Sequence, residues 1–233
     1  MDRVKNENLK PYVDYIVEQA KALLAIDSPS GYGKDVSAYL LKELDRLGFR
    51  GWKTRKGSVM ADLGGKAKED AVLLEAHCDT LGAMVHEIKS NGHLKLTNIG
   101  GMQANNAETE NVRIITKSGK IYEGTCQLTN PSVHVNGDYK TTPRTWDSVE
   151  VIVDEDINSR EEAKALGIMA GDYVCFEPRT RVTESGYIKS RFLDDKLPSA
   201  ILLGFAKYLK EENITPDRQI YLHFTIYEEV GHG

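Results

Sequence analysis

The sequence has few cysteines, no long apolar run and no excess of basic residues. Its cysteines are Cys78, Cys126 and Cys175, which are far apart and form no CxxC pair. This spacing argues against a disulfide framework and against a thiolate zinc site, so we expect reduced thiols. The opening residues "MDRVKNENLK" lack the apolar core of a signal peptide, and no later window approaches the length of a membrane span. These absences predict a cytoplasmic protein without a membrane partner.

The charge balance also limits the class of partner. The formal net charge is −5, whereas proteins that bind nucleic acid normally concentrate basic residues on one face. We therefore expect no nucleic-acid partner. Hydrophobic residues make up 40% and charged residues 28% of the 233 positions, as in ordinary globular proteins. A chain of this length can bury a core as one large domain or two modest ones.

The first third of the chain has the pattern of an α/β domain. Apolar residues recur at helical spacing over residues 9–24 and 34–47, which predicts two amphipathic helices. Segments rich in β-forming residues follow at 58–65 and 71–80. Val72 to Ala76 is a continuous apolar run, which is typical of a strand covered by helices on both faces.

From about residue 83 the pattern changes to short strands separated by turn signals. Asn91-Gly92 and Ser118-Gly119 are two such signals, and the spacing predicts a compact antiparallel barrel or sandwich. One helix interrupts the strands. Ser159 and Glu162 form a capping box at its start, and Gly167 can end it in the left-handed conformation.

The α/β pattern returns at residues 187–195. We expect a strand there, then an amphipathic helix with Pro198 in its first turn, then a strand at 219–227 that is apolar on both faces. The fold class is therefore α/β, with one discontinuous domain that carries an inserted β-domain. The predicted divisions are residues 1–82 and 187–233 for the α/β domain and 83–186 for the insert.

Three polar clusters lie where predicted buried strands end. They are His77 with Asp79, Asp194 with Asp195, and Glu228 with Glu229. In open α/β sheets, functional sites gather outside the carboxyl ends of the strands, so clusters that are distant in sequence can converge there. We therefore expect one shared site.

The chemistry of that set points to bound cations. Several carboxylates and an imidazole in one pocket repel one another and raise each other's pKa values unless positive charge is present. Two of the three clusters contain no Lys or Arg. Mixed histidine and carboxylate ligation suits zinc, cobalt or manganese, and two such ions bridged by a carboxylate form a hydrolytic centre.

Each cluster also has a simpler interpretation. An isolated histidine such as His77 at a strand end is usually not a ligand, although Asp79 can orient its ring. Asp194 and Asp195 are equally consistent with a helix N-terminus, where acidic residues are favoured. Glu228 and its neighbour can be an exposed strand end. The joint occurrence of all three clusters favours the metal interpretation.

Five segments, in this order and at this spacing, resemble a known family. They are "SPSGYG" (28–33), "AHCDTLGAMV" (76–85), "EEAKALGIMAGDYV" (161–174), "RFLDDK" (191–196) and "YEEVGHG" (227–233). The sequence resembles the dinuclear-metal aminopeptidases of the tetrahedral, glutamyl-aminopeptidase and deblocking-aminopeptidase type. The resemblance implies a doubly wound sheet like that of the zinc aminopeptidases, interrupted by an inserted antiparallel β-barrel.

The resemblance also implies a role for each site residue. His77, Asp194 and Glu229 would bind metal, and Asp194 would bridge two ions. The peptide bond between Asp194 and Asp195 can be cis in this family. Asp79 would orient His77. Glu228 would be the general base that takes a proton from the attacking water and passes it to the leaving amine.

The implied activity is that of a metalloprotease acting as an aminopeptidase. It would remove N-terminal residues from peptides with a free N-terminus and would use two divalent ions, zinc, cobalt or manganese. The inserted β-domain would form dimers that build into a dodecamer; a lid or spacer is the other interpretation of this domain. The sequence does not choose the residue preference or the metal.

The sequence departs from the family in three ways. Lys196 stands where the family has Arg, and His232 lies near the paired glutamates. Family members also continue well past this length and supply there an Asp ligand and a distal His ligand. We therefore expect the chain to lack two metal ligands, as a truncated form, as a split enzyme with a complementary C-terminal chain, or as a remnant acting as a scaffold. A two-metal hydrolase acting on a non-peptide substrate is a further alternative.

Overall fold

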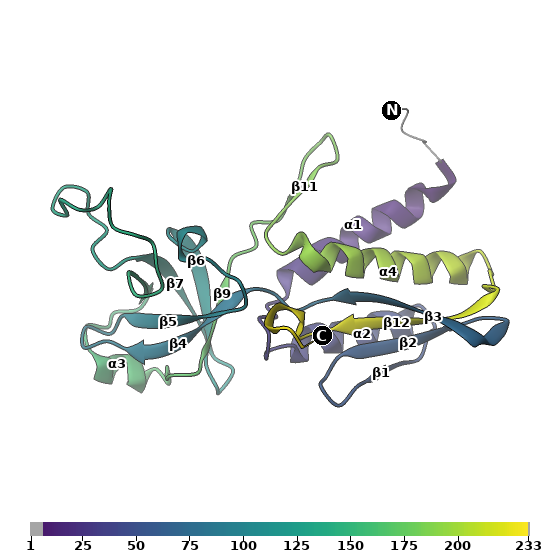
Figure 1. Ribbon diagram of the computed structural model, residues 1–233, viewed down its shortest axis with the longest axis horizontal. Coiled ribbons are helices and arrows are strands. Elements are labelled where there is room, and N and C mark those ends of the chain that lie inside the picture. The colour runs from purple at the N-terminus through teal and green to yellow at the C-terminus, as the bar shows by residue number, and fades with distance from the viewer. Residues whose placement is uncertain (1–6, 233) are drawn as a thin grey trace. The chain divides into compact units, whose positions relative to one another are not determined.

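The chain forms two compact units in a computed structural model that describes residues 7–232. The first unit contains the residues up to Asp79 and those from Pro178 onward, and the second contains Thr80–Glu177. The sequence placed the insert at 83–186, whereas this unit begins three residues earlier and ends nine residues earlier. Figure 1 traces the chain through both units.

Three helices and a four-stranded mixed sheet make up most of the first unit. The helices are α1 (Lys10–Ala25), α2 (Lys34–Arg46) and α4 (Leu193–Glu211). The sheet has the order β1 (Gly51–Lys53), β2 (Val59–Gly64), β12 (Arg218–Thr225) and β3 (Ala67–His77). The mixed α/β fold predicted from the sequence is confirmed.

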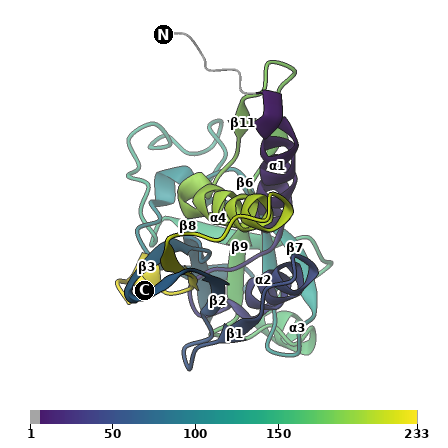
Figure 2. The same ribbon diagram turned by 90° about the vertical axis from the view of Figure 1, so that its right-hand side faces the viewer.

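One face of this sheet carries the core of the first unit. Val59, Ala61 and Leu63 of β2 alternate with more exposed residues, as do Leu222 and Phe224 of β12, and these buried side chains pack in one cluster with α1, α2 and α4. The period of two places every second side chain on the helix side. Figure 2 shows α1 and α4 close together over the sheet.

The prediction that the run from Val72 to Ala76 is covered on both faces is wrong for the part of the chain described here. β3 is the edge strand of the sheet, and Leu73 is 51% exposed. Glu75 points to the same face and pairs with His223 of β12 at 2.7 Å. Strand alternation gives β3 only one helix-covered face, because the helices of the core cluster all pack on that side.

The predicted strand, helix, strand unit has a different first strand. Residues Ile188–Lys189 form β11, which pairs with β10 (Arg181–Val182) in a separate two-stranded hairpin. The strand parallel to β12 is β3, and their register places Thr225 opposite His77. The connection from β3 to the parallel strand β12 is therefore a crossover. It contains the whole insert first and then α4, which leads into β12.

The second unit is the predicted antiparallel barrel. Its strands are β4 (Gly82–Ile88), β5 (Leu94–Ile99), β6 (Glu110–Ile115), β7 (Ile121–Leu128), β8 (Val149–Val153) and β9 (Tyr173–Phe176). They close in the order β4-β5-β8-β7-β6-β9, so the last strand of the unit pairs with the first. Gly92 and Gly119 take positive φ angles of 85° and 86° in the predicted turns.

The helix within the barrel unit, α3 (Arg160–Ala165), starts as the sequence predicts. The Ser159 hydroxyl accepts a hydrogen bond from the Glu162 main-chain N–H at 3.3 Å. The Glu162 carboxylate accepts one from the main-chain N–H of Asn158 at 2.7 Å, one residue earlier than in the standard capping box. Gly167 follows the helix with a φ of 88°.

The three cysteines are buried and free of disulfides. Within residues 7–232, no helix combines the length and the apolar character that crossing a membrane requires.

Candidate active site

Two of the three polar clusters lie at the carboxyl ends of neighbouring parallel strands. His77 is the last residue of β3, and Asp79 lies two residues further on. Glu228 and Glu229 begin the 3-10 turn η3 (Glu228–Val230), just beyond the end of β12. Parallel pairing brings these strand ends together without any further loop geometry.

The third cluster is not at a strand end, which corrects that part of the sequence interpretation. Asp194 and Asp195 lie at the amino end of α4, where their φ and ψ angles are non-helical and the peptide bond between them is cis. Phe192, just before, has a φ of 63°. Pro198 therefore falls in the first regular turn of α4, where proline is tolerated.

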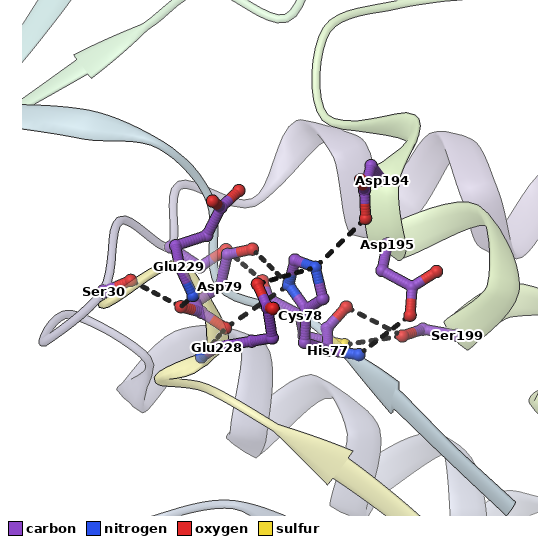
Figure 3. Close-up of polar contacts among 10 residues, drawn as sticks. Ser30, His77, Cys78, Asp79, Asp194, Asp195, Ser199, Glu228 and Glu229 are labelled. Atoms are coloured by element: carbon purple, nitrogen blue, oxygen red, sulfur yellow. Dashed lines mark hydrogen bonds and ion pairs between the residues drawn. The ribbon is translucent and has the colours of Figure 1, made fainter. Parts of the chain in front are cut away.

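His77 is the residue to which all three clusters connect (Figure 3). Its Nε2 lies 3.1 Å from Oδ1 of Asp194 and 3.6 Å from Oε2 of Glu228. Its Nδ1 faces the main-chain oxygen of Asp79 at 3.1 Å and the Asp79 carboxylate at 3.4 Å. The Asp79 side of the ring is thus fixed by hydrogen bonding, and Nε2 faces the carboxylates of the other two clusters.

Asp79 is completely buried and holds the paired glutamates in place. Its carboxylate accepts hydrogen bonds from the main-chain N–H groups of Glu228 and Glu229, both at 3.2 Å, and from the hydroxyl of Ser30. Burial alone would raise the pKa of Asp79, but the hydrogen bonds from His77, Ser30 and the two N–H groups outweigh it and lower the pKa. Asp79 therefore remains an anion inside the protein.

Asp195 ties the amino end of α4 to the end of β3. Its carboxylate accepts a hydrogen bond from the main-chain N–H of His77 at 3.2 Å. The hydroxyl of Ser199, one turn along α4, donates to the main-chain oxygen of His77 at 3.2 Å. The His77 peptide groups are thus bound from both sides by one helix, which fixes the distance between Asp194 and the imidazole.

The electrostatics of the site favour positive charge. Burial would lower the pKa of His77, but the hydrogen bonds and charge of Asp79 and the contact with Asp194 raise it to about 9. Burial, together with neighbouring carboxylates, raises the pKa values of Glu229 and Asp195. The surrounding acids thus stabilise a cation and destabilise further negative charge.

The side-chain types of the site, though not their spacing in this structure, fit a divalent metal such as zinc, cobalt or manganese. An imidazole nitrogen faces two carboxylates, which is the mixed ligand set these ions accept. The Glu229 carboxylate makes no hydrogen bond or ion pair with His77 or Asp194 among the residues described (Figure 3). Correspondingly, no group of three His, Cys, Asp or Glu side chains in residues 7–232 is arranged to hold a metal.

Lys196 and His232, the two departures from the family pattern, lie in different surroundings. Lys196 is completely buried, and its Nζ donates to the main-chain oxygens of Leu23 at 2.9 Å and Ile26 at 2.6 Å, at the carboxyl end of α1. His232 donates its main-chain N–H to Tyr227 at 3.0 Å. The Lys196 charge therefore stabilises the carboxyl end of α1.

Ser30 and Ser199 contact the site although no role was predicted for them. Ser30 belongs to the segment "SPSGYG", which is one of the family motifs, but the motif did not indicate that the Ser30 hydroxyl binds Asp79. Ser199 lies in an amphipathic helix, and the apolar pattern of this helix does not indicate that the serine is buried. In both cases the partner atoms are distant in sequence, so no local pattern carries the information.

The hydrogen bonds of Asp79 lead to a stability prediction. Asp79→Asn keeps the shape of the side chain but presents an amide N–H₂ group to at least one of the three donors, so we expect a loss of about 1–3 kcal/mol in the free energy of unfolding. Urea denaturation followed by circular dichroism measures it. Asp70→Asn is the control, because the Asp70 carboxylate forms an exposed ion pair with Arg218 and its loss should change stability by less than about 0.5 kcal/mol. Equal effects of the two changes would contradict the anchoring role.

Comparison with known proteins places this site in a family context. The model of the family "M42 glutamyl aminopeptidase" matches residues 57–233. YhfE of Bacillus subtilis, whose name gives it provisionally as an aminopeptidase, is 39% identical over 93% of this chain and 63% of its own. The lysyl aminopeptidase of Pyrococcus furiosus is 30% identical over 75% of this chain and 48% of its own.

The solved structures give the same picture. The TET1 peptidase of Pyrococcus horikoshii, described as assembling into a tetrahedron or a large octahedral shell, superposes with a TM-score of 0.77 and 25% identity. The match covers 93% of this chain and 62% of the other. The chain thus spans less than two thirds of the length of each of these proteins.

Proposed function

Because the chain belongs to the M42 glutamyl aminopeptidase family, we propose that the protein is a metal-dependent aminopeptidase that removes the N-terminal residue of peptides. The observation that carries the proposal is that the carboxylates of Asp194 and Glu228 both lie near Nε2 of His77. This is the edge of the sheet where α/β enzymes bind their substrates. These residues supply a carboxylate that can accept a proton and nitrogen and oxygen atoms that can ligate a cation.

In this proposal the acidic and imidazole side chains divide into three tasks. His77, Asp194 and Glu229 would hold divalent metal. We propose two ions per site. Asp79 positions His77 through Nδ1 and holds the main chain of the paired glutamates. Glu228 is the general base, because its carboxylate is partly exposed to solvent and faces the same nitrogen as Asp194.

The chemistry follows from these positions. A bound divalent metal supplies Lewis-acid activation of the scissile carbonyl and of water. Glu228 takes the proton of the attacking water at its carboxylate and then donates it to the leaving amine, so the carboxylate is regenerated at the end of the reaction. Asp79 keeps the Glu228 main chain fixed while the proton moves.

We also propose that the protein assembles as a homo-oligomer. The Pyrococcus horikoshii TET1 peptidase can assemble into a tetrahedron or a large octahedral shell, and the barrel of Thr80–Glu177 is a compact unit that can supply an interface. A dimer that builds into a dodecamer is the specific form proposed.

Paired peptides test the activity. With zinc or cobalt added, the protein should release the first residue of an unblocked pentapeptide, detected by mass spectrometry, and should leave the N-acetylated peptide intact. Chelation by EDTA should stop the release, and added metal should restore it. Equal cleavage of the blocked peptide would contradict the aminopeptidase assignment. A complete lack of cleavage, with hydrolysis of a phosphoester or a sugar instead, would favour another hydrolase, and binding without any hydrolysis would favour a scaffold.

A further inference from the structure

The β10–β11 hairpin of the first unit encloses a cavity that is lined mainly by basic residues. Its volume is about 390 Å³. It is lined by Pro178, Arg179, Arg181, Lys189, Ser190 and Arg191. Four of these six residues are cationic at neutral pH and none is acidic, in a chain whose formal net charge is −5. The cavity is thus a local concentration of positive charge on an acidic protein.

The register of the hairpin sets like charges against one another. Arg181 of β10 lies directly opposite Lys189 of β11, an arrangement that destabilises a strand pair because the two cations repel each other across it. The hydroxyls of Thr180 and Ser190 pair at 2.8 Å, which holds this register at the neighbouring position. The structure therefore keeps two cations together where an apolar or oppositely charged pair would stabilise the hairpin more.

These two cations are not neutralised by the part of the chain described here. Neither Arg181 nor Lys189 forms an ion pair with any residue in 7–232, and both are exposed. Arg179 adds a third cation at a strained position, since its φ of 54° lies in the left-handed region that arginine rarely adopts. An anion in the cavity would relieve the repulsion and satisfy several N–H donors at once.

The cavity adjoins the candidate active site along the chain. Arg191, Phe192, Leu193 and Asp194 are consecutive, and the hairpin runs directly into the amino end of α4 (Figure 1). Because a residue spans at most about 3.6 Å, the main chain of Arg191 lies within roughly 11 Å of that of Asp194. An extended peptide covers this distance with about three residues.

We propose that this basic cavity binds a carboxylate of the peptide substrate, on the part that follows the residue to be removed. The carboxylate is an acidic side chain near the third position of the peptide. Guanidinium groups suit this ligand because their paired N–H donors match the two oxygens of a carboxylate. This inference rests on the proposed aminopeptidase function and adds to it a preference for acidic peptides.

A matched pair of peptides tests the preference. One carries Glu at the third position and the other Gln, with a free N-terminus and amidated C-terminus in both. We expect a value of kcat/KM about tenfold higher for the Glu peptide, mainly through KM, because a charge-assisted contact contributes on the order of 1.4 kcal/mol. In the variant Arg181→Gln/Lys189→Gln the ratio should fall to near one, with the Gln peptide cleaved as before. Lys68→Gln, an exposed lysine of β3, is the control and should keep the ratio.

A binding measurement separates this inference from the proposed function. Fluorescence anisotropy with the N-acetylated Glu peptide and its Gln counterpart requires no hydrolysis, so it is informative even for a protein that cuts neither. Tighter binding of the Glu peptide that is lost in the double variant and weakened by 0.5 M salt, at a Debye length of about 4 Å, supports the inference. Equal binding of the two peptides overturns it, and so does competition by inorganic phosphate at the same concentration as the peptide, which would identify a site for free anions.

Discussion

Glu228→Gln should lower kcat by about three orders of magnitude while the protein keeps its fold. A general base typically contributes 10²- to 10⁴-fold to a hydrolysis, and glutamine has the same shape but cannot take a proton. The main-chain N–H of residue 228 still donates to Asp79 in the variant, so the positions of the paired residues are preserved. The side chain of Glu228 is 59% exposed, which makes a large effect on stability unexpected.

Steady-state hydrolysis of an unblocked peptide measures this loss, and metal content is determined in parallel by atomic absorption. Glu69→Gln is the matched control, because Glu69 is exposed on β3 away from the cluster. It should retain full kcat. If Glu228→Gln turned over at the wild-type rate with its metal bound, Glu228 would not be the base, and another of the clustered carboxylates would have to take that role.

Lys196→Met should cause the largest loss of stability among single changes near the site. Methionine fills a similar volume but cannot donate, so the main-chain oxygens of Leu23 and Ile26 lose a buried, charged donor. We expect a decrease of about 3 kcal/mol in the free energy of unfolding, since an unsatisfied buried group costs about 1–3 kcal/mol and the Ile26 oxygen loses this donor, while the Leu23 oxygen keeps only the main-chain N–H of Ile26. The melting temperature should fall by about 10 °C.

Thermal denaturation followed by circular dichroism measures this change. Lys21→Met is the control, because Lys21 lies on α1 and is exposed; it should shift the melting temperature by less than about 2 °C. Lys196→Arg distinguishes packing from charge, since arginine keeps the charge but is larger and planar. A melting temperature for Lys196→Met within 2 °C of the wild type would show that the capped carbonyls contribute little.

The regular elements were predictable because they depend on local periodicity. The apolar spacing of residues 9–24 and 34–47 yields α1 and α2 within a residue or two, and the turn signals of the insert separate the strands of the barrel. The partners of β3 were not predictable in this way. An apolar run fixes a strand but not its place in the sheet, so Val72 to Ala76 gives no sign that β3 is an edge strand.

The site was predictable in composition but not in its supporting contacts. His77, Asp194 and Glu228 were found from strand ends and family motifs, and they meet in the structure. The hydroxyl of Ser30 on Asp79 and the burial of Lys196 depend on contacts between distant segments. Such contacts leave no trace in the spacing of residues along the chain.

The pairing of β4 with β9 shortens the effective length of the chain that joins the two segments of the first unit, the residues up to Asp79 and those from Pro178 onward. Ala83 lies opposite Val174 at the junction of the first and last barrel strands, so the entry and the exit of the insert are neighbours. Loop-closure entropy grows with the number of flexible residues between two contacts. Once the barrel is formed, β3 and the α4–β12 segment are joined by a short bridge in place of a long flexible chain. The contact of His77 with Asp194, which are 117 positions apart in sequence, then closes a shorter effective loop at a lower entropic cost.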